Sequence, residues 1–98
     1  MAHEGWTFLT NHARVLVGLA REPDARIQDV AAAAGITERA AQRIVTDLCD
    51  SGYLLRTRVG RRNTYQINGD LPLRHEAESG TRIGELLALL RGPVESST

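Results

Sequence analysis

Three side chains that can read the edges of nucleic-acid bases recur at helical spacing in the middle of the chain: Arg39, Gln42 and Arg43. In the major groove of duplex DNA, arginine can form two parallel hydrogen bonds with guanine, and glutamine can do the same with adenine. Glu38 and Thr46 fall on the same face if the segment is helical. Every side chain on this face can therefore form hydrogen bonds.

The start of this predicted helix offers a second kind of contact. Thr37 is suited to the N-cap position, and the unpaired N–H groups of a first helical turn, together with the helix dipole, favour an anion such as phosphate. Glu38 opposes a phosphate but can accept a hydrogen bond from cytosine. The same face is also what any solvated amphipathic helix presents, so the helix alone leaves both interpretations open. The candidate nucleic-acid contacts in the segment 37–51 are Thr37, Glu38, Arg39, Gln42, Arg43 and Thr46.

A basic β-hairpin is predicted directly after this helix. The segments 53–59 and 64–67 are rich in aromatic, branched and threonine residues, and the run 60–63 between them has turn chemistry. Alternation places Arg56 and Arg58 on one strand face, where like charges repel unless an anion neutralises them. The predicted tip can reach the minor groove or the phosphate backbone, whereas the alternative is a hairpin whose charges only protect its edge. The candidate contacts are Arg56, Arg58, Arg61, Arg62 and Asn63.

The distribution of charge is more informative than its total. The chain has 12 basic and 12 acidic residues, so its net charge is zero. Residues 39–62 hold six arginines against two aspartates, a net +4, whereas the segments 1–38 and 63–98 each carry −2. One central basic segment favours a nucleic-acid partner, while the zero total favours a protein-interaction module on the same fold.

The elements that must position these side chains follow from the apolar spacing. We expect a first helix capped by Thr10, a short second helix over 27–34 closed by Gly35, and the third helix over 37–51. A very short strand is possible at 26–27. Two short helices joined by a tight glycine-containing turn and followed by a hairpin are the order of a winged helix-turn-helix.

The remainder of the chain is predicted to support a dimer. An irregular connection over 68–80 leads to a C-terminal helix over 81–91, capped by Thr81, and then to a disordered tail over 92–98. The first and last helices have apolar stripes wider than a small core needs, so we expect them to pair across a two-fold axis. The predicted interface residues are Leu16, Leu19, Ile83, Leu86, Leu87 and Leu90.

The expected fold is one domain over residues 1–98, mainly α with a small β-hairpin wing (α+β), in the winged helix-turn-helix class. Its core spans 10–67, including the wing at 53–67. This part resembles bacterial transcriptional regulators of the MarR and ArsR type. The residues that carry the resemblance are IQDVA at 27–31, GITER at 35–39, GYL at 52–54 and GRRNTY at 60–65.

The resemblance implies a sequence-specific regulator of transcription that binds double-stranded DNA as a cytoplasmic homodimer. It places Arg39, Gln42 and Arg43 in the major groove, and Arg61 and Arg62 in the wing. Departures from the two families matter. Metal sensors of the ArsR type need clustered ligands, whereas this chain has one cysteine and three dispersed histidines, so no metal or other cofactor is expected. Proteins of the MarR type are usually longer, and a small-molecule effector is unsupported here.

The remaining residues favour structural roles. No glycine-rich phosphate loop or paired carboxylates are present, so an enzyme is not expected, and His12 and His75 are interpreted as solvated or capping residues. Cys49 is expected to be a small buried hydrophobe. Trp6 and Phe8 are expected to fasten the N-terminal segment onto the core or onto a second subunit. No apolar run approaches the roughly 20 residues that span a bilayer, so no membrane contact is expected.

Overall fold

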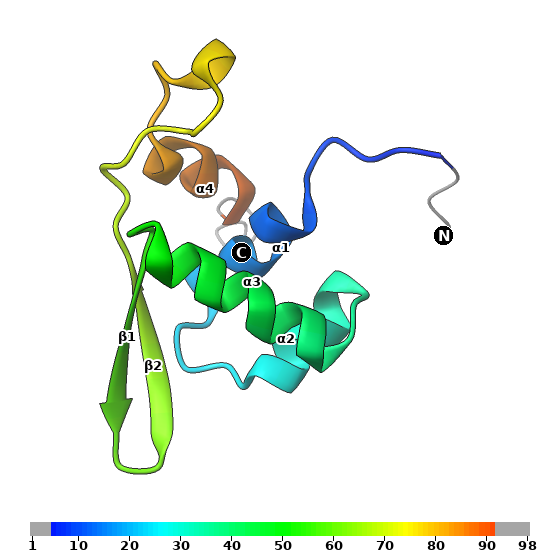
Figure 1. Ribbon diagram of the computed structural model, residues 1–98, viewed down its shortest axis with the longest axis vertical. Coiled ribbons are helices and arrows are strands. Elements are labelled where there is room, and N and C mark those ends of the chain that lie inside the picture. The colour runs from blue at the N-terminus through cyan, green and yellow to red at the C-terminus, as the bar shows by residue number, and fades with distance from the viewer. Residues whose placement is uncertain (1–4, 92–98) are drawn as a thin grey trace, which may run out of the picture.

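The computed structural model describes residues 5–91, so the predicted tail at 92–98 lies outside the described residues. Within them the chain forms an α+β fold of four α-helices and one antiparallel hairpin that follows the third helix (Figure 1). A short 3-10 helix, η1, precedes the last α-helix. The elements are α1 (Asn11–Arg21), α2 (Ile27–Ala34), α3 (Glu38–Asp50), β1 (Leu54–Val59), β2 (Arg62–Ile67), η1 (Glu76–Glu78) and α4 (Ile83–Arg91).

Local side-chain chemistry sets the ends of the first three helices. Thr10 Oγ1 accepts a hydrogen bond from the Ala13 N–H at 3.1 Å, and Thr37 Oγ1 accepts one from the Ala40 N–H at 3.0 Å. Both residues are therefore N-caps, as the sequence predicts. Gly35 ends α2 with φ of 76°, a left-handed conformation that glycine adopts without steric cost. The short turn after it fixes where α3 begins.

The very short strand predicted at 26–27 is not formed. The Arg26 carbonyl accepts hydrogen bonds from the N–H groups of Asp29 and Val30 at 3.0 and 3.1 Å. These bonds commit the backbone to the first turn of α2, so Ile27 is the first residue of that helix. The prediction was wrong because helical bonds formed where a strand partner was expected.

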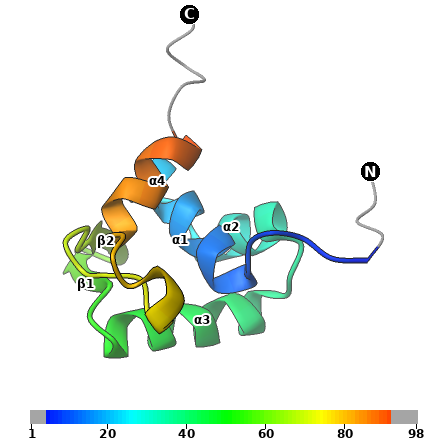
Figure 2. The same ribbon diagram turned by 90° about the horizontal axis from the view of Figure 1, so that it is seen from above.

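One face of α3 packs onto α1 and forms the centre of the core. The predicted apolar positions of α3 are all buried, and the long side chains of α1, including the fully buried Val15 and Leu19, cover them. Figure 2 shows α3 along the bottom of the molecule, with α1 and α2 above it in this view. The buried apolar residues are Val15, Leu16, Val17, Leu19, Val30, Ala31, Ala41, Ile44, Val45, Leu48, Tyr53, Leu54, Tyr65, Ile83 and Leu87.

Four of the six predicted interface residues belong to the core of a single chain. Leu16, Leu19, Ile83 and Leu87 have 0–7% of their surface exposed, so they offer a partner little surface of their own. The wide stripes of α1 and α4 arise because α1 contacts α2, α3, α4 and β2, and α4 docks back onto α1. Leu86 and Leu90 are half-buried against the same core.

The hairpin has a tighter turn than predicted. Its strands pair from Leu54 with Ile67 to Val59 with Arg62, which leaves only Gly60 and Arg61 in the turn. Gly60 has φ of 65°, as two-residue hairpin turns require. The predicted four-residue turn over 60–63 was therefore too long, because two of its residues join the strand ladder. The hairpin projects away from the helices (Figure 1).

The connection over 68–80 is more ordered than the sequence indicates. It contains η1, and its start pairs with the segment before α4 in a bridge between Pro72 and Arg82. The Thr81 carbonyl accepts a hydrogen bond from the Leu73 N–H at 2.9 Å, so Thr81 belongs to this pairing. Helix α4 therefore begins at Ile83, two residues after the predicted cap.

Two glycines from distant segments meet at the start of α4. The Gly84 N–H donates to the Gly69 carbonyl at 3.0 Å. A Cβ at Gly84 would lie 2.9 Å from that carbonyl oxygen and 3.1 Å from the Gly69 Cα. Since both obstacles are backbone atoms, only glycine allows α4 to dock this closely.

We therefore predict that Gly84→Ala lowers the free energy of unfolding by about 1–3 kcal/mol, the usual cost of overpacking. The direction opposes helix propensity, because alanine favours a helix interior by up to about 1 kcal/mol over glycine. Gly80→Ala is the matched control, since open space surrounds that position. Urea unfolding followed by circular dichroism measures both variants. Stability of Gly84→Ala equal to or above that of the native protein would contradict the glycine contact.

Candidate nucleic-acid interface

The predicted contact residues on the outward face of α3 are all polar. Arg39, Gln42, Arg43 and Thr46 are all exposed, opposite the buried apolar face. Within residues 5–91, the two arginines make no side-chain hydrogen bond or ion pair, and Gln42 makes only a 3.5 Å contact with Glu38 Oε2. Their hydrogen-bonding groups are therefore available to an external partner.

The start of α3 keeps part of its capacity for an anion. Thr37 Oγ1 is occupied as an acceptor by the Ala40 N–H, while its hydroxyl hydrogen remains available to donate. Glu38 is exposed in the first turn, where a carboxylate complements the helix dipole. The Glu38 carboxylate also lies beside the free N–H groups and repels a phosphate there, so a phosphate must approach from the side of Thr37.

The five predicted contacts of the hairpin have different surroundings. Arg56 directs one N–H at the Cys49 sulfur over 3.9 Å, and the Nε of Arg58 donates to the Gly60 carbonyl at 3.2 Å. Arg61 occupies the turn, is exposed, and has no side-chain partner among the described residues. Arg62 and Asn63 lie in β2 rather than in the turn.

The register places Arg56 and Arg58 on one strand face, as predicted, because they pair with Tyr65 and Asn63. Their guanidinium groups have different neighbours, at the end of α3 and at the turn. Nothing in this arrangement requires an anion between them. Repulsion between Arg56 and Arg58 is therefore a weaker indication of an anion on this face than the sequence suggested.

The turn after α1 fixes the orientation of the hairpin. Arg62 Nη2 donates to the Asp24 carbonyl at 2.7 Å, and Thr64 Oγ1 donates to Asp24 Oδ1 at the same distance. The Tyr65 N–H also donates to the Pro23 carbonyl at 3.2 Å. Arg62 thus has a structural role that the sequence did not indicate, since its partner lies 38 residues away.

The face of α3 and the tip of the hairpin border one hollow of about 360 Å³. Gln42 of α3 and Arg61 of the turn both line it, and Arg26, at the start of α2, adds a third element. The charged groups in this hollow are three arginines and two carboxylates. Its full lining is Asp24, Ala25, Arg26, Ile27, Glu38, Gln42, Arg61, Arg62, Asn63 and Tyr65.

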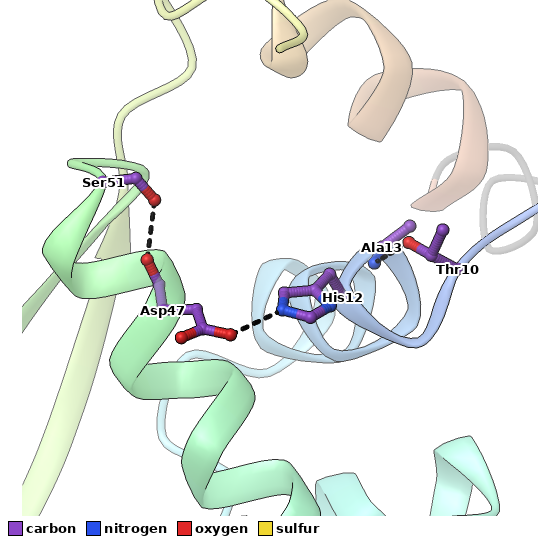
Figure 3. A network of polar contacts seen from close by, with 5 residues as sticks. All are labelled: Thr10, His12, Ala13, Asp47 and Ser51. Atoms are coloured by element: carbon purple, nitrogen blue, oxygen red, sulfur yellow. Dashed lines mark hydrogen bonds and ion pairs between the residues drawn. The ribbon is translucent and has the colours of Figure 1, made fainter. Parts of the chain in front are cut away.

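A histidine and a carboxylate from different helices meet on the side of α3 near α1 (Figure 3). His12 Nε2 lies 2.9 Å from Asp47 Oδ2, and both side chains are about half exposed. Ser51 Oγ donates to the backbone carbonyl of Asp47 at 2.6 Å rather than to the imidazole, so no serine–histidine pair is formed. These residues are far apart in the chain, so no local pattern indicated the pair. His12, expected to be solvated or capping, is exposed and also contacts Asp47.

The other singled-out residues have varied outcomes. His75 caps η1 by accepting the Ala77 N–H on Nδ1 at 2.9 Å, which confirms a capping role. Cys49 is half-buried against the core rather than fully buried. Trp6 and Phe8 are exposed, so the prediction that they fasten the N-terminal segment onto the core was wrong. Within residues 5–91, no three metal-ligating side chains are grouped closely enough to hold an ion.

Comparison with known proteins adds no assignment. No protein-family model matches the chain, and no curated protein matches its sequence. None of the described helices has both the length and the apolar character needed to cross a membrane. The function of the protein is therefore inferred from the geometry of the described residues.

We predict that Thr64→Val loosens the hairpin, because it removes the hydroxyl that bonds Asp24 while keeping the branched shape. The free energy of unfolding should fall by about 0.5–1.5 kcal/mol, the usual net contribution of one hydrogen bond. Thr57→Val is the control, since Thr57 pairs directly with Thr64 and has no side-chain bond among the described residues. Hydrogen exchange of the hairpin amides, with urea unfolding, distinguishes the two variants. Equal protection in both would show that the Asp24 contact does not hold the hairpin.

Proposed function

We propose that this protein binds double-stranded DNA as a winged helix-turn-helix transcriptional regulator. In this proposal α3 enters the major groove and the tip of the hairpin lies on the adjacent backbone or in the minor groove. One observation carries the proposal. Exposed arginines lie on two elements, α3 and the hairpin turn, that border one hollow. Arg39 and Arg43 on α3 and Arg61 in the turn are exposed without side-chain partners among the described residues, and Gln42 and Arg61 line the same hollow.

The dimensions of α3 suit this role. A helix of 13 residues is about 20 Å long, and the major groove, about 12 Å wide, admits an α-helix. The base-reading candidates occupy its first two turns, where a recognition helix contacts base edges. Arginine and glutamine read guanine and adenine there, while Thr37 and Arg61 suit phosphates.

The direction of the hairpin, fixed by its hydrogen bonds to Asp24, matters for this proposal. A tip that moved freely would lose conformational entropy on binding, whereas a hairpin already held by hydrogen bonds loses less. The bonds from Arg62 and Thr64 therefore support binding without themselves touching DNA. In this interpretation Arg62 is a positioning residue, and Arg61 makes the contact.

We further propose that the protein acts as a homodimer in the cytoplasm of a bacterial cell. Two copies would present their α3 helices to successive major grooves about 34–36 Å apart, and the bound site would be nearly palindromic. Because Leu16, Leu19, Ile83 and Leu87 are only 0–7% exposed, an interface also needs exposed residues beside them.

A protein-interaction module is the second candidate. Leu55 and Val59 are 60% and 62% exposed on the hairpin face opposite Leu54, and a protein partner could cover them. This module would use the outer face of the hairpin and leave the arginines of α3 unbound. It therefore makes the opposite prediction for arginine substitutions.

For a random-sequence duplex, we predict that Arg39→Ala with Arg61→Ala weakens binding at least about tenfold. Each lost phosphate contact should also make the slope of log affinity against log salt shallower by about 1. Fluorescence anisotropy across a salt series measures both quantities. The variant Arg82→Glu lowers the net charge by the same two units at one exposed position outside α3 and the hairpin, and should bind like the native protein.

Equal losses in Arg82→Glu and in the double variant would indicate attraction by overall charge rather than a specific surface. No detectable binding by the native protein at low salt would favour the protein-interaction module. Loss confined to the first variant supports α3 and the hairpin tip as the DNA-binding surface.

A further inference from the structure

The N-terminal segment carries two large aromatic side chains that its own chain leaves in water. Trp6 is 73% exposed and Phe8 is 90% exposed. Their rings contact each other edge to face, with centroids 4.9 Å apart. Each aromatic side chain can bury about 150–250 Å², and the pair does not gain the free energy of this burial as long as it stays in water. We call residues 5–9 the arm.

Hydrogen bonds at the base of the arm fix its direction. Arg14 of α1 donates to Thr7 Oγ1 at 2.7 Å and to Asn11 Oδ1 at 2.9 Å. Leu9 is half-buried and lines a hollow with Val17 and other residues of α1 and α2. The arm consequently leaves the helical body instead of folding over it (Figures 1 and 2).

An apolar groove opens on a different side of α1. It has a volume of about 710 Å³ and lies between α1, the end of α3, the segment 71–74 and α4. Its apolar lining is Ala13, Leu16, Leu48, Leu73, Ile83 and Leu86.

Polar groups surround this apolar lining. The His12–Asp47 pair and Arg74 line the groove, and Arg74 has no side-chain partner among the described residues. The groove thus combines an apolar floor with a cation that can stack on an aromatic ring. Thr10 and Ala13 also line it, which places its edge within one helical turn of the base of the arm.

We propose that two copies of this chain exchange their arms, so that Trp6 and Phe8 of each copy fill the groove of the other. The base of the arm and the edge of the groove are adjacent, so a two-fold axis near the start of α1 brings each arm to the partner's groove. Five residues span at most about 17 Å, which limits the reach to such a neighbour. The bonds of Arg14 direct the arm away from its own groove.

The areas reach the lower size limit of a specific dimer interface. Two aromatic side chains per arm can bury about 300–500 Å². With both arms and the exposed walls of both grooves the total is about 900–1,300 Å², close to the roughly 1,000 Å² that a specific interface needs. The proposal rests on the homodimer proposed above but not on DNA binding, and it adds the exposed side chains of the arm to the groove that Leu16, Ile83 and Leu86 line.

Trp6 is the only tryptophan of the chain, so its fluorescence reports the arm directly. For the full chain without DNA, we expect the mass from sedimentation equilibrium to double with concentration. The Trp6 emission should shift to shorter wavelength over the same range.

Phe8→Ala should weaken dimerisation at least about 30-fold and Trp6→Ala with Phe8→Ala at least about 100-fold, as substitutions of central aromatic residues do. Leu89→Ala is the control, because Leu89 is 75% exposed on α4 and lies outside the groove lining.

A mixing experiment tests the exchange itself. Leu86→Arg places a charge in the groove but keeps Trp6, whereas Trp6→Ala with Phe8→Ala keeps an open groove but has no tryptophan. Each variant alone should be a monomer with helical circular dichroism. Mixed together, they should associate through one arm and one groove, and the Trp6 emission should shift to shorter wavelength.

Three results would overturn the proposal. A monomer at all concentrations excludes the exchange, and a dimer whose Trp6 emission does not shift uses another surface. A shifted emission that does not depend on concentration means that the arm fills its own groove. Should Leu86→Arg fail to fold, the arm variants still decide the question, since both aromatic side chains are exposed and outside the core. None of these readouts depends on whether the protein binds DNA.

Discussion

The packing of one face of α3 onto α1 is the interaction on which the rest of this structure depends. A chain of 98 residues can bury only a modest core, and the buried faces of α1 and α3 form its centre. Helix α2, the base of the hairpin and α4 are each added to this pair, since α1 contacts α2, α4 and β2, and α3 contacts β1. Because α3 gives its apolar face to the core, its other face must be polar and is left on the surface.

The arginines separate into those that the fold uses and those that it leaves free. Arg62 holds the hairpin against the turn after α1, and Arg21 donates to the Leu90 carbonyl at 2.8 Å, which ties α1 to the end of α4. By contrast, Arg39, Arg43 and Arg61 have no side-chain partner among residues 5–91. A guanidinium group that stabilises nothing within the chain can contact an external anion without breaking an internal bond. This difference, more than the number of arginines, supports a DNA-binding surface on α3 and the hairpin tip.

Much of the fold could be predicted from local chemistry. The caps at Thr10 and Thr37, the left-handed Gly35 and the two faces of α3 depend on residues within a few positions of each other, and all are found. The hairpin was also predicted, but its turn was too long because pairing of Arg62 with Val59 extends the ladder.

Contacts between distant segments could not be predicted in this way. Nothing near Asp24 indicates that it accepts a bond from Thr64, and nothing near His12 indicates Asp47. The same limit applies to the predicted dimer interface, since a wide apolar stripe does not reveal whether its partner is the same chain or another. For the candidate site, the residue types and the exposed face of α3 were predicted, whereas the hollow shared with the hairpin tip and Arg26 required the structure.

Selection from a pool of genomic duplex fragments at several salt concentrations is the sharpest test of whether α3 and the hairpin tip form a surface for duplex DNA. We expect retention that falls steeply with salt, and enrichment of a short, nearly palindromic motif in the retained fragments. No retention even at low salt would rule out a DNA-binding surface here and would assign the free arginines to solvent.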